Sequence, residues 1–121
     1  MSDEISLSLE DNCIRVKATG APSLDGLRRT LSQINALSRE HARYRVLVDS
    51  REVQGQPPGA DIYDGGELLA EALAPGTRVA VLVRTITDDH RFFENVAVNR
   101  GVPVCYFQDE AMALDWLGGS A

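Results

Sequence analysis

The segment from Arg78 to Arg84, RVAVLVR, constrains the fold more than any other part of the chain. Its central residues are all aliphatic, and most are β-branched. A strand with one solvent-facing side alternates apolar and polar residues, whereas a strand that is covered on both faces reads as a continuous apolar run. We therefore predict that this segment is a central strand of a largely parallel sheet with helices on both faces.

The segments on either side alternate strand and helix signals. Residues 5–9 and 13–17 alternate apolar and polar side chains around EDN, which predicts a β-hairpin. Ser23 is a good N-cap, and apolar residues follow it at helical spacing. The stretch 51–61 reads as a loop, because it contains two glycines and two prolines. Further strands are expected at 44–49 and 102–107, and further helices at 62–73, after Thr87 or Asp88, and after Asp109.

The resulting order is ββαβαβαβα, a hairpin followed by three αβ units. This order predicts an α/β fold whose mixed sheet is antiparallel at its beginning and parallel afterwards, with crossover helices covering it. The chain has 121 residues, of which 44% are hydrophobic and 25% charged. That size and composition are typical of one globular domain, so we assign residues 1–121 to a single domain.

Charge and composition exclude several kinds of partner. The net charge is −6, and neither nucleic acid nor an anionic membrane surface attracts an acidic protein. No apolar stretch approaches the roughly 18 residues that cross a bilayer, and the N-terminus lacks a leader pattern. We therefore expect a cytoplasmic protein without a membrane span. Cys13 and Cys105 lack metal or redox spacing, so we expect reduced core residues, no metal and no cofactor.

The C-terminal segment VPVCYFQDEAMALDWL and the element order resemble the SpoIIAA-like fold, which STAS domains share with lipid-binding SEC14 (CRAL-TRIO) domains. In small stand-alone bacterial proteins of this type, a strand that ends in an aromatic residue leads into a short, acid-capped helix ending in Trp-Leu. The matching residues here are Phe107, Asp109, Ala113, Trp116 and Leu117. The resemblance implies a SpoIIAA-like sheet and a regulatory or lipid-binding role.

Ser50 is the residue that a STAS phosphoswitch would require. STAS antagonists of anti-sigma factors carry a phosphorylatable serine in a DSSG-like turn at the start of the helix after the third strand. Here Asp49-Ser50 is followed by Arg51-Glu52, and a loop intervenes before the next helix. Ser50 would therefore lack the helix N-terminus that stabilises a phosphate, and phosphorylation at Ser50 is only weakly indicated.

A ligand site is expected where the parallel strands end. Ligands of open α/β sheets bind beyond the carboxyl ends of the strands. Polar residues gather at these ends, and arginines with nearby hydroxyls suit a small carboxylate or phosphate. The alternative is that Asp49 pairs with Arg51 or Arg84 and only finishes a strand. The candidate ligand-binding residues are Asp49, Ser50, Arg51, Arg84, Thr85 and His90.

No complete catalytic set is visible. A receiver domain would need an acidic pair after its first strand and a lysine after its last, and both are missing. No G-x-S-x-G elbow or Walker loop is present, and neither His41 nor His90 has an evident nucleophile as a partner. Asp88, Asp89 and His90 are consecutive and cannot all face one metal ion. Adjacent Phe92 and Phe93 cannot both point straight into the core unless the buried face is broad, so one of them is a candidate groove or dimer contact.

These observations favour a non-enzymatic regulatory or binding module of STAS-like type, acting through protein contact or a small anionic ligand. The alternative is a small carrier of lipids or apolar metabolites of SEC14-like type, using the region of Tyr63, Phe92 and Phe93. A third hypothesis is an enzyme that needs a partner subunit. We also expect a homodimer, because small folds with exposed strand edges often pair.

Overall fold

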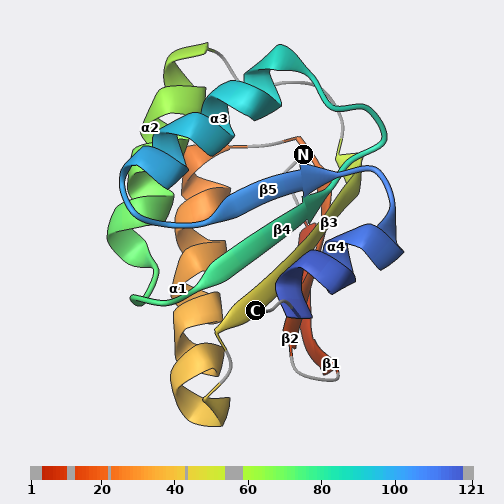
Figure 1. The fold of residues 1–121 in the computed structure, drawn as a ribbon. Helices are drawn as coiled ribbons and strands as arrows, with labels where there is room; N and C mark the ends of the chain where they lie inside the picture. Colours follow the sequence, from red (N-terminus) through yellow and green to blue (C-terminus); the bar gives the residue numbers. More distant parts are fainter. Residues whose placement is uncertain (1–3, 11–12, 22, 43, 54–58, 119–121) are drawn as a thin grey trace.

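The computed structural model describes residues 4–10, 13–21, 23–42, 44–53 and 59–118. Strands and helices alternate along the chain after an initial pair of strands (Figure 1). They are β1 (Glu4–Glu10), β2 (Cys13–Gly20), α1 (Leu24–His41), β3 (Arg45–Val53), α2 (Gly59–Ala72), β4 (Arg78–Leu82), α3 (Asp88–Asn99), β5 (Val104–Phe107) and α4 (Glu110–Gly118).

The strands form one five-stranded sheet in the order β1-β2-β3-β4-β5. β1 pairs antiparallel with β2, with Leu7 opposite Val16, and the later neighbours are all parallel. The predicted hairpin, element order and mixed sheet are therefore confirmed. Because β2 to β5 run parallel to one another, their carboxyl ends all lie at the same end of the sheet.

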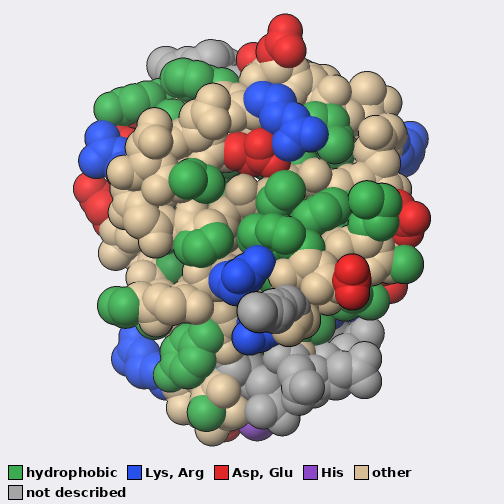
Figure 2. Space-filling view, viewed as in Figure 1, with side chains coloured by type: hydrophobic (Ala, Val, Ile, Leu, Met, Phe, Trp, Pro, Cys, Tyr) green, Lys and Arg blue, Asp and Glu red, His purple; other side chains and the backbone are tan. Residues whose placement is uncertain are grey.

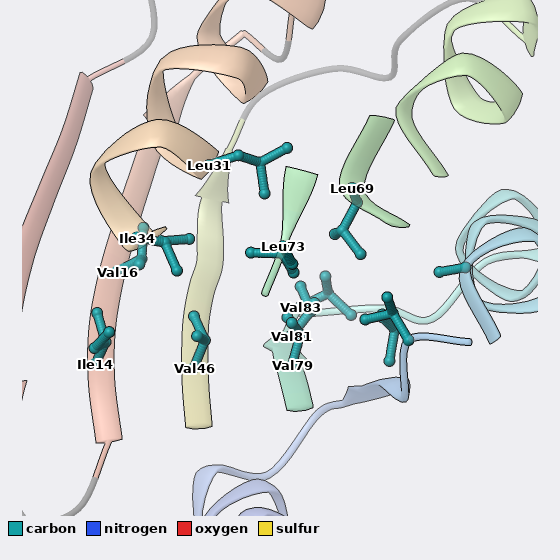
Figure 3. Packing of buried hydrophobic residues seen from close by; sticks show 13 residues of the cluster. Ile14, Val16, Leu31, Ile34, Val46, Leu69, Leu73, Val79, Val81 and Val83 are labelled. Atoms are coloured by element: carbon teal, nitrogen blue, oxygen red, sulfur yellow. The ribbon is translucent and has the colours of Figure 1, made fainter. Parts of the chain in front are cut away.

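Helices cover both faces of the sheet, as the apolar β4 predicted. On one face, β-strand residues pack against α1, α2 and α3 around Leu31, Leu69 and Ala97 (Figure 3). On the other face, Leu47 and Leu82 pack against Ala113 and Leu117 of α4. Val79 to Val83 are all buried, which accounts for the continuous apolar run in this part of the sequence.

Several element ends differ from the sequence prediction. β3 continues to Val53 instead of ending at Asp49, and α2 begins at Gly59 instead of about Ile62. Two pairings with β2, Thr19 opposite Glu52 and Gly20 opposite Val53, extend β3 into the segment that was predicted as a loop. The rest of that loop, residues 54–58, lies outside the described part of the chain.

Local capping signals were read correctly. The side chain of Ser23 accepts from the backbone of Gly26 at 3.0 Å, and the side chain of Thr87 accepts from His90 N at 3.2 Å. Asp109 Oδ1 accepts from Ala111 N at 2.8 Å at the start of α4. Gly101, which follows α3, has a φ of 99° that a side chain would strain.

The glycine pair of α2 has a packing role. A Cβ atom at Gly66 would lie 2.7 Å from Val96 Cγ1 of α3, and one at Gly65 would lie 3.2 Å from the Phe93 ring. The two helices therefore approach more closely than side chains at these positions would allow. The low helix propensity of glycine, which costs roughly 1 kcal/mol per residue, is tolerated here because it permits this close contact.

Other sequence predictions concern cysteines, metals and membranes. Neither Cys13, which is buried, nor Cys105, which is half-buried, takes part in a disulfide in the described structure. Within the described ranges, His, Cys, Asp and Glu side chains form no cluster that could hold a metal ion. None of the helices in that part of the chain is long and apolar enough to cross a bilayer.

Candidate functional site

Asp49 lies in a network of four charged side chains between the sheet and α4. Its carboxylate accepts two hydrogen bonds from Arg51, at 2.9 and 2.8 Å, and contacts Arg15 Nη2 at 3.3 Å. Arg15 of β2 makes a two-point contact with Glu110 at 3.0 and 3.1 Å, and Arg51 reaches the same carboxylate at 3.3 Å. Two arginines and two carboxylates thus neutralise one another; below they are called the Asp49 network.

The electrostatics of the Asp49 network favour the ionised carboxylates. Hydrogen bonds from Arg51 lower the pKa of Asp49 to about 2, although burial opposes this shift. The pKa of Glu110 is also lowered, chiefly by its hydrogen bonds with Arg15. Asp49 is therefore an acceptor that is already occupied at neutral pH, and it is a poor proton donor or base.

A β-bulge places Arg51 beside Asp49. Lys17 lies opposite Asp49 and Thr19 opposite Glu52, so the two residues Ser50 and Arg51 face the single residue Ala18. The extra residue turns the chain so that the backbone N–H of Arg51 donates to Asp49 Oδ1 at 3.2 Å. Ser50 is a half-buried residue of this strand and precedes the start of α2 at Gly59 by nine positions.

The Asp49 network fixes the beginning of α4, and other arginines fix its end. The guanidinium of Arg45 donates to the carbonyl of Leu117. Arg78 donates to the carbonyl of Trp116 at 2.9 Å and lies 4.3 Å above its ring. Arginines that reach the free carbonyls of the last turn stabilise a helix C-terminus. The charges at the end of β3 therefore take part in holding α4 on the sheet.

Arg84 and Thr85 lie exposed after β4 and do not join the Asp49 network. The carbonyl of Arg84 accepts from Gln108 Nε2 at 2.8 Å, which links the ends of β4 and β5. The charge of Arg84 is close enough to contribute to a lowered pKa of Glu52, whose main cause is the hydrogen bond from Lys17. Asp49 therefore pairs with Arg51, as one sequence interpretation allowed, and with Arg15, but it forms no ion pair with Arg84.

His90 belongs to the start of α3. Its Nδ1 accepts from the backbone N–H of Thr87 at 3.1 Å, which completes a capping box with the Thr87 side chain. The imidazole stacks on Tyr106, with centroids 4.5 Å apart and planes 15° from parallel. Burial lowers the pKa of His90, so the ring is held in the neutral form that this cap requires.

The sheet separates the predicted site residues into two groups. Arg51 contacts Glu110 of α4 and binds Asp49, so these two residues lie on the side of α4. His90 stacks on Tyr106, which packs into the core on the opposite face, beneath α1 to α3. One small ligand would not contact both groups. The ligand-binding role of these residues stays a prediction. It now concerns two separate candidate sites, one near α4 and one near Tyr106.

Sequence reasoning missed Arg15 and Glu110. Arg15 was read only as the polar partner in an alternating strand, and Glu110 follows the helix cap Asp109 without a motif of its own. Their contact joins residues that are 95 positions apart. The sequence offered one weak signal of this contact: β2 and α4 both bury apolar side chains, and each also carries a charged residue.

The aromatic residues of α2 and α3 divide between core and surface. Phe93 packs edge-to-face on Tyr106, with centroids 6.3 Å apart, and belongs to the core. Phe92 is 46% exposed, and its ring stacks with that of Tyr63, which is 42% exposed, at 6.4 Å. Green side chains gather at the upper left of Figure 2, over α2 and α3. Exposed aromatic pairs of this kind are common at protein interfaces.

The outer edge of β5 is occupied by a side chain. The backbone N–H of Tyr106 donates to Glu94 Oε2 at 2.5 Å, and Arg91 holds that carboxylate at 2.8 Å. A carboxylate on an edge N–H opposes the addition of another strand there. The predicted homodimer therefore has no free partner site at this N–H.

Structure comparisons place the chain among proteins of known fold. An anti-sigma factor antagonist from Mycobacterium paratuberculosis superposes with a TM-score of 0.64 at 17% identity, covering 98% of this chain and 96% of that chain. The antagonist SpoIIAA in its unphosphorylated form gives 0.58 at 12% identity, with 97% and 100% covered. An uncharacterized protein with a SpoIIAA-like fold from Shewanella loihica gives 0.57 at 18% identity, with 95% and 93% covered.

These likenesses confirm the fold that was inferred from the sequence. The chain has the SpoIIAA-like fold over nearly its whole length. No protein-family model matches the sequence, and no curated protein matches it either.

Proposed function

We propose that this protein is a non-enzymatic regulatory module that acts by binding another protein. The observation that carries the proposal is the exposed Tyr63–Phe92 pair on α2 and α3. On the other face of the sheet, the charges of Asp49 and Arg51 are already neutralised within the molecule. A binding module needs an exposed contact surface and no reactive group. Two of the solved structures with this fold are anti-sigma factor antagonists, and protein regulation by this fold is therefore a precedent.

The proposed mode of action does not use phosphorylation of Ser50. In the described structure Ser50 is a half-buried residue of the β3 bulge, and the next helix begins only at Gly59. A phosphate on this strand residue would lack the N–H groups of a helix N-terminus. Regulation would then depend on the presence of the protein and of its partner.

A small anionic ligand is the second candidate, and Arg84 is the observation that favours it. Its side chain is exposed at the end of β4 and forms no ion pair with any of the residues that the structure describes. Arg51, in contrast, already contacts two carboxylates. An anion would therefore bind at Arg84 and Thr85, and Arg84→Gln would abolish its stabilising effect in a thermal-shift screen of phosphate and dicarboxylates.

Purification of the tagged chain from its source cells at native expression level tests the main proposal. We expect a second protein in near-stoichiometric amount that binds the purified chain again in a defined ratio. Recovery of the chain alone, as a monomer or as a homodimer, would contradict the proposal. A bound apolar ligand in native mass spectrometry would instead favour the carrier hypothesis.

A further inference from the structure

The outer surface of α2 and α3 combines an apolar centre with an acidic rim. The centre is the stacked pair Tyr63 and Phe92. The rim consists of exposed carboxylates on both helices, and we call the whole the α2–α3 surface. Its rim residues are Asp88 and Asp89 at the start of α3, and Asp64 and Glu71 on the side of α2 that lines the groove toward α1. Asp88 and Asp89 precede Phe92 by four and three positions, so they lie on its side of α3.

The cations near this surface are already paired. Arg100 forms an ion pair with Glu67 and donates to the Tyr63 hydroxyl at 3.0 Å. Arg28, in the groove between α1 and α2, pairs with Asp25 at 3.3 Å. Asp64, Glu71, Asp88 and Asp89 form no ion pair with any cation in the described part of the chain. The surface therefore carries a net excess of negative charge around two exposed rings.

We infer that the α2–α3 surface docks a basic, amphipathic segment of another protein, with an apolar side chain on Tyr63 and Phe92 and Lys or Arg on the rim. This inference rests on the proposed function and names the surface and the partner's chemistry. Buried aromatic residues supply most of the binding energy at such interfaces, and complementary charge speeds association and selects the partner. A net charge of −6 extends this attraction beyond the contact itself.

Other occupants fit the charge pattern less well. Nucleic acid and anionic lipid headgroups would meet carboxylates. A second copy of this chain that used the same surface would place one acidic rim against another, because a two-fold interface is formed by identical patches. A basic, amphipathic segment can both cover the exposed rings with an apolar side chain and form ion pairs with the rim carboxylates.

Site-specific photo-crosslinking in the source cells tests this inference. A benzoylphenylalanine replaces Asn95, which is exposed one turn after Phe92, and a control replaces Met112, which is 61% exposed on α4. Mass spectrometry then identifies the crosslinked peptide. We expect position 95, but not position 112, to capture a segment of another protein that has excess Lys and Arg and a large apolar residue.

Variants in the same background make the result quantitative. Phe92→Ser should reduce the crosslink by about tenfold, the effect of losing one interface anchor. The pair Asp88→Asn and Asp89→Asn should reduce it several-fold, because the complementary charge of the rim is removed. Circular dichroism confirms that each variant is folded.

Several outcomes would overturn the inference. The first is that position 95 gives no crosslink, or captures this chain itself or an acidic or neutral segment. The second is that the Phe92→Ser variant gives the same crosslink yield as the protein with Phe92. If a stoichiometric partner is recovered but its crosslinks map to another surface, the docking surface is wrong and the proposed function stands. If no partner is recovered at all, both are wrong.

Discussion

Asp49 and Arg51 are held together by two side-chain hydrogen bonds, Nε to Oδ1 at 2.9 Å and Nη2 to Oδ2 at 2.8 Å. The pair lies where a ligand of this kind of sheet would be expected. The Asp49 side chain is only 6% exposed, and Arg51 also contacts Glu110 of α4. The most conspicuous polar motif of the sequence therefore serves to attach a helix.

Asp49→Asn should lower the free energy of unfolding by about 2 kcal/mol, because one pKa unit corresponds to about 1.4 kcal/mol and the pKa of Asp49 is lowered from 3.8 to about 2. Urea denaturation measures the change. The matched control is Glu52→Gln, which removes an exposed ion pair with Lys17 and should leave the midpoint unchanged. Equal effects of both substitutions would contradict the structural role of Asp49.

Acid should remove the contribution of Asp49 in a defined window. A carboxylate whose pKa is lowered on folding stabilises the native state above the unfolded pKa of 3.8, and this stabilisation disappears as the pH falls through about 2. The difference in stability between the wild type and Asp49→Asn should therefore be constant above about pH 5 and shrink progressively between about pH 5 and pH 1. A difference that does not change with pH in this window would argue against the assignment.

Gly66→Ala should destabilise the protein by about 1 to 2 kcal/mol. Overpacking against Val96, 2.7 Å from the new Cβ, outweighs the gain in helix propensity. Combining it with Val96→Ala should lower the free energy of unfolding by less than the sum of the two single substitutions, because the closest clashing atom, Val96 Cγ1, is removed. Gly118→Ala is the control, since nothing lies within 4 Å of that position.

Protonation of His90 should weaken the start of α3. Its Nδ1 must be unprotonated to accept from Thr87, and its folded pKa is lowered by burial, against opposing contributions from Asp89, Glu94 and the Thr85 backbone. The stability due to neutral His90 is therefore complete above the unfolded pKa of 6.5 and is lost as the pH falls through the lower folded pKa.

His90→Gln tests this expectation, because glutamine at the same capping-box position can accept from Thr87 without titrating. The variant should lose the slope of stability with pH below about 6.5, an unperturbed histidine pKa. His41→Gln retains His90 and should retain the slope. If His90→Gln behaves like the wild type, His90 is not the titrating group.

The fold could be predicted because its signals are local. The side chains of Ser23 and Thr87 cap helices by accepting from a backbone N–H three positions later. The continuous apolar run of β4 indicates that both faces of this strand are buried. The bulge at Ser50 and Arg51 could not be predicted, because it depends on the register with β2. The sequence interpretation therefore ended β3 too early.

The candidate site was less predictable, because its contacts are long-range. Asp49 and Arg51 were identified, but Arg15 and Glu110, which complete their network, are 95 positions apart. His90 was grouped with Asp49 because both follow strands, and only the packing on Tyr106 places it on the other face of the sheet. Which of Phe92 and Phe93 is buried was likewise decided by the position of α3 relative to β5.

In the roles proposed above, the Asp49 network holds α4 on the sheet, whereas the α2–α3 surface binds a partner protein. The most direct test measures two quantities for Asp49→Asn and Phe92→Ser: the free energy of unfolding, and the affinity for the segment captured at position 95, prepared as a synthetic peptide. We predict that Phe92→Ser weakens binding about tenfold with nearly unchanged stability. Asp49→Asn should lower stability by about 2 kcal/mol and leave the affinity of the folded protein unchanged. Loss of affinity in Asp49→Asn, with none in Phe92→Ser, would contradict the account.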